Sequence, residues 1–286
     1  MRWQGRVVWS VLSLVVLLAV SAAPVGGQTP QHEFLKKCSI VFVGQVVRVG
    51  DVSFAGVPKS PRTIVVQVDD VFEKPRAVSL VKGDRVTVEV KDPAQFRRGA
   101  RVTFYANGWI FGDGVAVREV GHEILPAAVK TRSEDGAGQQ VTQIRKELSD
   151  AEVQSRIQAA DMVMVGRVKA IRPATRAVAG DAPKALVSEH NADWQEAVIE
   201  VESGIKGAQA NQEIVVRFPG SLDAAWYGVP KFTLGQEGTF FLQKDTLSGT
   251  PKALLGGAIV DAYIARSPRD VLAKSEAPRV RGLVRP

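Results

Sequence analysis

One sequence pattern occurs twice in this chain of 286 residues, and the repeat limits the possible architectures more than any other feature. Residues 40–49 (IVFVGQVVRV) correspond to residues 162–171 (MVMVGRVKAI), 122 positions later. Residues 99–105 correspond in the same way to residues 235–241, 136 positions later. Because both matches occur in the same order, we expect two copies of one structural unit, the second about 14 residues longer.

The first 27 residues have the features of a secretory signal peptide. Arg2 and Arg6 supply the positive start, residues 7–20 are mostly apolar, and small residues such as Ala22 follow. The apolar run has 14 residues, fewer than the ~20 that a membrane-spanning helix needs. We therefore expect removal of residues 1–27 and an exported protein, periplasmic or secreted, without a membrane span. A retained N-terminal anchor is the alternative.

Cys38 is the sole cysteine, so the chain cannot form an internal disulfide and both units must rely on hydrophobic cores. Phe34, Leu35 and Cys38 have the spacing of one helical face. A buried thiol is therefore the favoured interpretation, and an intermolecular disulfide is the alternative.

The formal net charge of +7 is unevenly distributed along the chain. Arg2 and Arg6 belong to the expected signal peptide, and the residues from Arg266 onward carry +4. The remaining body is nearly neutral and lacks the clustered basic surface of a nucleic-acid-binding protein. Residues 267–286 also contain three prolines, and we expect them to form a basic disordered tail.

Each copy is expected to begin with a short helix. Thr29 and Pro30 provide a cap and a first-turn proline for one helix, and Ser149 and Glu152 have capping-box spacing at the start of the other. The polar, glycine-bearing segment before Ser149 is typical of a linker. These signals predict a first domain at residues 28–128, a linker at 129–148 and a second domain at 149–266.

Five segments in each copy have the composition and alternation of β-strands. In the first copy they are residues 40–49, 63–72, 85–91, 101–107 and 115–119; in the second they are residues 162–171, 196–202, 213–218, 239–243 and 257–264. Gly44 and Gly166 occupy the same position in long first strands, where a glycine commonly marks a bulge or bend. We expect a mainly β fold of two tandem five-stranded OB-like barrels, each preceded by a short helix. A generic five-stranded sandwich is the alternative.

The second copy resembles bacterial domains similar to tissue inhibitors of metalloproteinases and netrin-like modules. The resemblance rests on residues 160–168 (ADMVMVGRV), on residues 197–207, which end in Ile-Lys-Gly, and on the glycine turn and aromatic strand of residues 234–242. It covers about 110 residues and is fainter in the first copy, where Lys74 and Pro75 stand near the Lys-Gly position. It implies an OB-like barrel in an exported protein.

The chain departs from this family at its only cysteine. Animal inhibitors with this fold chelate a protease zinc through a free N-terminal cysteine that has disulfides nearby. Cys38 lies inside the expected mature chain and has no second cysteine to pair with. The chelating role therefore does not carry over to Cys38.

No catalytic or metal-binding pattern stands out. His32, His122 and His190 are scattered, and none of them belongs to a zinc-protease motif or has further ligands at metal-binding spacing. Nucleophile and phosphate-binding motifs are absent from the sequence, and neighbouring Asp69 and Asp70 point to opposite faces of a strand. We expect a non-enzymatic protein that uses no cofactor and no metal.

Aromatic residues near expected loops are the candidate binding residues. Residues 172–195, which include Trp194, form a long connection that supplies most of the length difference between the copies. Trp226 and Tyr227 lie among Gly, Pro and Asp, and Trp109 and Phe111 lie between two glycines. Each aromatic either closes a core beneath a loop or anchors a partner.

These features predict an exported, non-enzymatic interaction protein that binds an extracellular or periplasmic protein or ligand. The alternatives are an exported enzyme or enzyme inhibitor with a site assembled between the modules, and a carbohydrate-binding module.

Overall fold

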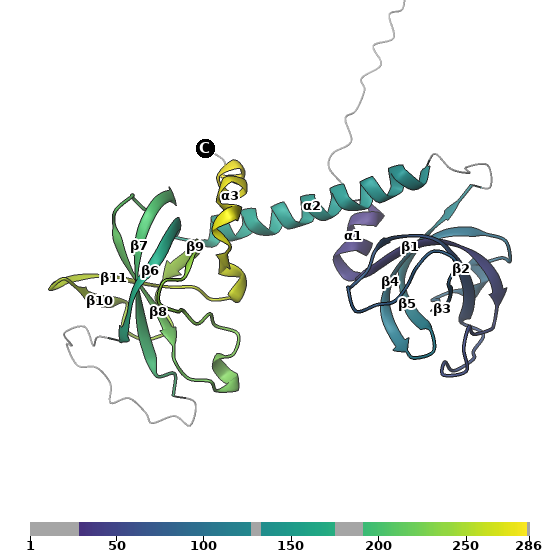
Figure 1. The fold of residues 1–286 in the computed structure, drawn as a ribbon, viewed down its shortest axis with the longest axis horizontal. Coiled ribbons are helices and arrows are strands. Elements are labelled where there is room, and N and C mark those ends of the chain that lie inside the picture. Colours follow the sequence, from purple (N-terminus) through teal and green to yellow (C-terminus); the bar gives the residue numbers. More distant parts are fainter. Residues whose placement is uncertain (1–28, 127–132, 175–190, 285–286) are drawn as a thin grey trace, which may run out of the picture. The chain divides into compact units, whose positions relative to one another are not determined.

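The chain folds into two compact β-rich units, residues 1–129 and residues 130–286. A computed structural model describes residues 29–126, 133–174 and 191–284 (Figure 1). The expected signal peptide, part of the expected linker and most of the long connection with His190 lie outside the described residues. The prediction of a mainly β protein is confirmed, and each unit is described below by itself.

The first unit begins with helix α1 (Pro30–Lys37), which starts where Thr29 and Pro30 predict it. Leu35 on this helix is fully buried, and the Phe34 ring lies 5.4 Å from the ring of Tyr105. Gly121 lies directly beneath Phe34, because a Cβ at this position would come within 2.5 Å of the ring. Cys38 is 7% exposed, which confirms the expected buried thiol.

Five strands of the first unit form a closed barrel in the order β1-β2-β3-β5-β4 (Figure 1). Strands β3 and β5 are parallel, and the other neighbours are antiparallel. The strands are β1 (Ile40–Val49), β2 (Thr63–Glu73), β3 (Arg85–Glu89), β4 (Arg101–Phe111) and β5 (Val115–Leu125), and a 3₁₀ turn η1 (Pro93–Gln95) precedes β4. The barrel interior is packed with valines and with the stacked rings of Phe42, Phe104 and Phe96.

The second unit contains a seven-stranded sheet in the order β10-β11-β8-β7-β6-β9-β12, with an additional pairing between β11 and β9. Its strands are β6 (Met162–Pro173), β7 (Trp194–Lys206), β8 (Glu213–Pro219), β9 (Glu237–Lys244), β10 (Lys252–Leu255), β11 (Ala258–Ile264) and β12 (Val271–Leu272). Strands β8 and β11 are parallel, as β3 and β5 are in the first unit. Strands β6, β7, β8, β11 and β9 of the second unit thus have the same neighbours as β1, β2, β3, β5 and β4 of the first unit.

Gly44 and Gly166 lie at equivalent irregularities in the first strand of each unit, as the repeat predicts. The pairing register shifts at Val43/Gly44 and at Val165/Gly166. A Cβ on Gly44 would lie 2.4 Å from the Gln67 carbonyl oxygen, and one on Gly166 would lie 2.6 Å from that of Glu200. These positions accept only glycine because the neighbouring backbone occupies the space of a side chain.

Helix α2 spans Ser133–Ala159, so most of the predicted linker at residues 129–148 is helical. Its apolar residues continue the helical spacing upstream from the expected start at Ser149, at Val141, Ile144 and Leu148. A side-chain ion pair four residues apart, Lys146–Asp150, adds to helix stability. The helix therefore includes residues 133–148, which were predicted to be a linker because of their polar residues and glycines.

The prediction of a disordered basic tail is wrong, because residues 267–284 are ordered. Residues 267–284 form η3 (Pro268–Asp270), β12, η4 (Lys274–Glu276) and helix α3 (Ala277–Leu283). Three of its basic residues have acidic partners in the same unit: Arg279 lies 2.7 Å from Asp150, Arg269 2.7 Å from Glu152, and Lys274 2.6 Å from Glu202. The charge excess of this segment is therefore neutralised locally rather than left to repel itself.

Val280 anchors the C-terminal segment on the unit. Its side chain is fully buried in a cluster with Val153, Ile157, Val163 and Phe241. We expect Val280→Ala to lower the free energy of unfolding by about 2 kcal/mol, since two buried methyl groups are removed and a cavity remains. Thermal unfolding should show a loss of several degrees.

Ile259→Ala is the matched control, because Ile259 is 59% exposed. Its melting temperature should stay close to that of the unaltered protein. Equal melting temperatures for Val280→Ala and the control would show that the tail does not contribute to the core.

Candidate functional site

The loop at residues 220–236 joins β8 to β9 in the second unit and contains two of the predicted binding residues. A 3₁₀ turn η2 (Ala224–Trp226) forms within it, and the Asp223 side chain caps this turn by accepting a hydrogen bond of 2.8 Å from the Ala225 backbone N–H. The Trp226 ring meets the Trp194 ring edge to face, with 5.3 Å between the ring centroids. Both tryptophans are half-buried. The structure therefore brings Trp194 of β7 and Trp226 of the loop together, as a brace between the loop and this strand.

Tyr227 follows the turn η2, and 86% of its surface is exposed. Leu222 precedes the turn, and 91% of its surface is exposed. Leu234, further along the same loop, is 70% exposed. Tyr227 is one of the residues predicted from the sequence, whereas the two leucines are not, because an isolated apolar residue in a loop has no periodic signal. Large apolar side chains with this exposure have little part in the core, so they are available for contact with another molecule.

The two ends of the loop are fixed to the unit. At its start, the backbone N–H groups of Gly220 and Ser221 donate to the carbonyl oxygens of Asp193 and Ala192, at 2.9 and 3.1 Å. At its end, Phe232 is buried and packs against Phe218, with ring centroids 5.3 Å apart. The middle of the loop is thus exposed while both ends are held.

Lys231 lies on the inner side of this loop. Its Nζ atom lies 3.4 Å from the Trp226 carbonyl oxygen, and burial lowers the pKa of its ammonium group.

The other predicted binding residues, Trp109 and Phe111, belong to the first unit. They lie on strand β4 rather than in the expected loop between two glycines, because β4 and β5 stay paired as far as Phe111 and Val115. Trp109 is half-buried under the guanidinium of Arg118, which lies 5.0 Å from its ring centroid. Arg118 also donates to Glu89 at 2.6 Å. Trp109 is therefore a stacking partner on the barrel wall, whereas Phe111 at the strand end is 56% exposed.

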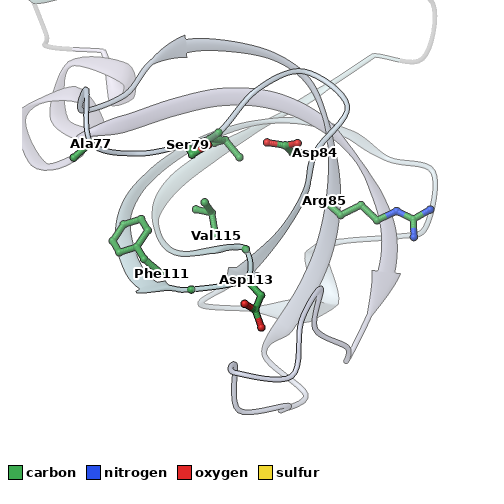
Figure 2. A pocket seen from close by; sticks show the side chains of 10 residues that line it. Ala77, Ser79, Asp84, Arg85, Phe111, Asp113 and Val115 are labelled. Carbon is green, nitrogen blue, oxygen red and sulfur yellow. The ribbon is translucent and has the colours of Figure 1, made fainter.

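Phe111 lines an open pocket of about 510 Å³ at one end of the barrel. The pocket lies between the loop that joins β2 to β3 and the turn that joins β4 to β5. Figure 2 shows Ser79 and Asp84 along one side and Phe111 and Asp113 along the opposite side, with the Arg85 guanidinium extending outward. Its size is within the range of small-molecule sites.

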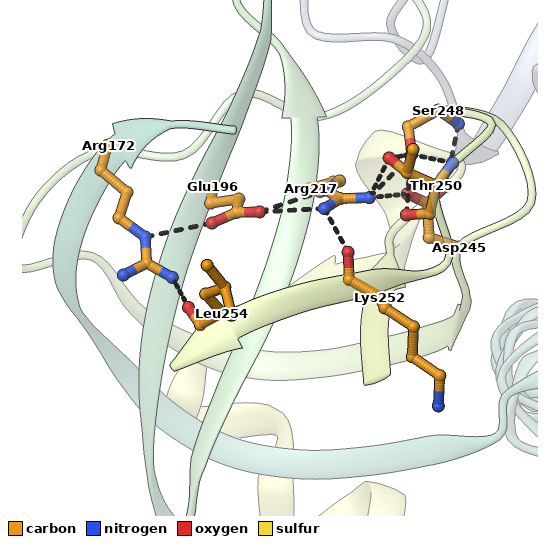
Figure 3. A network of polar contacts seen from close by, with 8 residues as sticks. All are labelled: Arg172, Glu196, Arg217, Asp245, Ser248, Thr250, Lys252 and Leu254. Atoms are coloured by element: carbon orange, nitrogen blue, oxygen red, sulfur yellow. Dashed lines mark hydrogen bonds and ion pairs between the residues drawn. The ribbon is translucent and has the colours of Figure 1, made fainter. Parts of the chain in front are cut away.

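A buried ionic network distinguishes the second unit (Figure 3). Arg217 and Glu196 are both fully buried, and the guanidinium donates twice to the same carboxylate oxygen, at 3.2 and 3.1 Å. Asp245 lies 3.5 Å from the other side of the guanidinium, and Arg172 donates to the second oxygen of Glu196 at 3.0 Å. Two arginines and two carboxylates thus balance each other's charge inside the unit.

The same arginines bind the outer edge of β10. Arg217 donates to the Lys252 carbonyl oxygen at 2.6 Å, and Arg172 donates to that of Leu254. β10 is the last strand in the sheet order, so these carbonyls have no neighbouring strand. The network therefore satisfies an otherwise open strand edge, a position that commonly favours unwanted pairing with another chain.

Two of the three histidines, His32 and His122, lie within the described residues, and each has one side-chain partner nearby. His32 lies 2.8 Å from the Thr29 hydroxyl at the start of α1, and His122 lies 2.6 Å from a carboxylate oxygen of Glu119. Burial by itself raises the pKa of the Glu119 carboxyl, but hydrogen bonds with His122 and the Lys91 backbone N–H outweigh it and lower the pKa. Within the described part of the chain, no group of three or more His, Cys, Asp or Glu side chains could hold a metal ion. Among the helices of these same residues, none is long and apolar enough to cross a membrane.

No protein-family model matches the chain, and no curated protein matches it in sequence.

The tryptophan brace should contribute to stability. We expect Trp226→Ala to lower the free energy of unfolding by about 1–3 kcal/mol, because it removes an edge-to-face ring pair and half-buried apolar surface. Tyr227→Ala is the adjacent control and should have almost no effect on unfolding. Denaturant titration of both variants measures this difference, and equal stability for the two would contradict the proposed brace.

The buried network should be far more sensitive to charge than the protein surface. Glu196→Gln leaves Arg217 with an incompletely balanced charge in the interior, so we expect a loss of about 3 kcal/mol or more in the free energy of unfolding. Glu200→Gln on the same strand is the matched control, since Glu200 is exposed, and it should change stability by less than about 0.5 kcal/mol. Chemical unfolding would contradict this expectation if both variants lost the same stability.

Proposed function

We propose that this chain is an exported, non-enzymatic interaction protein built from two OB-like modules. The strand order β1-β2-β3-β5-β4 with a parallel β3–β5 pair supports this assignment for the first unit. In the second unit, β6, β7, β8, β11 and β9 have the same neighbours, and the pairing of Tyr263 with Lys244 and of Ile264 with Gln243 joins β11 to β9. A long first strand bent at a glycine, followed by this order, is the arrangement expected of an OB-like barrel.

The proposed relationship to netrin-like and inhibitor-like domains draws support from the Lys-Gly position. Lys206 ends β7, and its Nζ atom donates to the Ile157 carbonyl oxygen at 2.8 Å. Gly207 follows with φ of 67°, a conformation that favours glycine. Cys38 is buried next to β1, so we do not extend the proposal to zinc chelation by a terminal cysteine.

The proposed contact surface for a protein partner consists of Leu222 and Tyr227, and this pair is the observation on which the function rests. Both side chains project from a loop whose ends are fixed, so little conformational entropy is lost when a partner covers them. Tyrosine is enriched among residues that dominate protein interfaces, because its large ring is amphipathic and has few rotatable bonds. An extracellular or periplasmic protein is the proposed partner.

The test compares three forms of the full chain purified after export: the unaltered protein, Leu222→Ala/Tyr227→Ala, and Ile259→Ala as a control on another exposed apolar residue. Each form is immobilised and exposed to periplasmic extract and to culture medium, and bound proteins are quantified by mass spectrometry. We expect one or more discrete proteins to bind the unaltered form and the control. The double variant should bind them about 30-fold more weakly, which corresponds to ~2 kcal/mol for a dominant contact.

Thermal unfolding of all three forms provides the necessary control for folding. The double variant should unfold at nearly the same temperature as the unaltered protein, because both residues are exposed. A partner that binds all three forms equally would contradict a role for this loop. Turnover of a co-purified small molecule would instead favour the alternative of an exported enzyme.

A further inference from the structure

We infer that the pocket of the first unit is a binding site for a neutral carbohydrate. This inference goes beyond the proposed partner surface, which lies on the second unit and recognises a protein. It depends on the rigidity of Phe111, on the hydrogen-bonding groups around the pocket and on the balance of charges there.

Phe111 forms a fixed aromatic platform at the edge of the pocket. A Cβ on Gly108 would lie 2.4 Å from the Cζ atom of Phe111, so the ring is in close contact with the backbone of its own strand. The residue nevertheless remains 56% exposed. The tip of the ring thus contacts the backbone while apolar ring surface faces solvent, where it can stack against the C–H face of a sugar ring.

The turn that carries this platform is held in place by a neighbouring loop. A Cβ on Gly114 would lie 2.8 Å from the ring of Phe54, which shows that Phe54 packs on the turn. Next to Phe54, the Ser53 backbone N–H donates to the buried Thr87 hydroxyl at 2.7 Å. This chain of contacts connects the pocket edge to strand β3, so the site is formed before a ligand arrives.

The polar groups around the pocket suit hydroxyl groups. Asp84 uses one carboxylate oxygen to accept from the Val81 backbone N–H at 2.8 Å, which fixes the side chain and leaves the other oxygen for a ligand. Asp113 contributes further acceptors, and the Ser79 hydroxyl can both donate and accept. Sugar hydroxyls donate to carboxylates and accept from hydroxyl and guanidinium groups, so both kinds of bond are available here.

The charges around the pocket favour a ligand without net charge. An anion would lie close to the Asp84 and Asp113 carboxylates, which line the pocket together with Arg85 (Figure 2). A cation would meet Arg85, and the exposed Arg76 and Lys82 belong to the loop that forms the pocket wall. A neutral polyhydroxylated molecule avoids both repulsions and still uses the polar groups.

Titration calorimetry on the full chain tests the inference with five-residue oligosaccharides of glucose (α-1,4, β-1,4 and β-1,3 linked), of xylose and of mannose. A cationic glucosamine oligomer and an anionic galacturonate oligomer of the same length are the charged probes. We expect at least one neutral oligosaccharide to bind, and Phe111→Ala and Asp84→Asn each to weaken this binding about tenfold or more. Asp84→Asn retains an oxygen for the Val81 N–H, so it removes the charge without removing the loop contact.

Two controls separate this site from other surfaces. Val49→Ala alters another exposed apolar residue of the first unit, and Tyr227→Ala alters the proposed protein-binding loop; neither should change sugar affinity. Retained affinity in both pocket variants, binding of the charged probes alone, or no binding of any neutral probe would overturn the inference. Loss of sugar binding in Phe111→Ala with an unchanged melting temperature, together with intact protein-partner binding, would support it independently of the function proposed for the second unit.

Discussion

The close approach of two backbones at one glycine in each first strand is the constraint on which both units depend. At Gly44 and Gly166 the neighbouring strand's carbonyl oxygen lies where a Cβ would stand. The register shifts there, so the first strand can bend and pair with a different neighbour along each side. In the first unit this bend allows the ring of five strands to close. The recurrence of the same contact after 122 residues explains why the repeat is strongest around these glycines.

The two copies also differ in the connection between their last two long strands. In the first unit a short turn joins β4 directly to β5 and leaves an open pocket beside Phe111. In the second, the corresponding connection after β9 contains the Asp245 loop and strand β10, whose turn uses Gly256 and Gly257 with φ of 57° and 85°. The added strand exposes carbonyl groups at its edge, and Arg172 and Arg217 bind them. A buried arginine is tolerable there because Glu196 and Asp245 balance its charge.

Much of the strand framework could be predicted from the sequence, whereas contacts between distant segments could not. Strand β1 begins at Ile40 and ends at Val49 as its composition predicts, and β2, β3 and β8 begin at the predicted residues. Alternation identifies such strands because it is local.

The folded tail was missed because Arg279 pairs with Asp150, 129 positions earlier, and a charge pattern alone does not show such a partner. The burial of Glu196 and Arg217 was missed because charged residues in a strand normally face solvent. The sequence pattern does not show that these two residues pair with each other. Trp109 and Phe111 were assigned to a loop because glycines flank them, although pairing with β5 extends the strand.

Residues that stabilise the fold and residues available for binding are separate in both units. In the second unit, Trp226 and Phe232 of the loop pack against Trp194 and Phe218, whereas Leu222 and Tyr227 of the same loop are exposed. In the first unit, Phe54 holds the turn while Phe111 remains exposed at its edge. An exposed leucine or tyrosine contributes little to folding, because the free energy gained from apolar surface depends on removing that surface from water. Its contribution arises when another molecule covers it. Such a division allows the contact residues to change without loss of the barrel, and it allows stability and binding to be measured separately on the same chain.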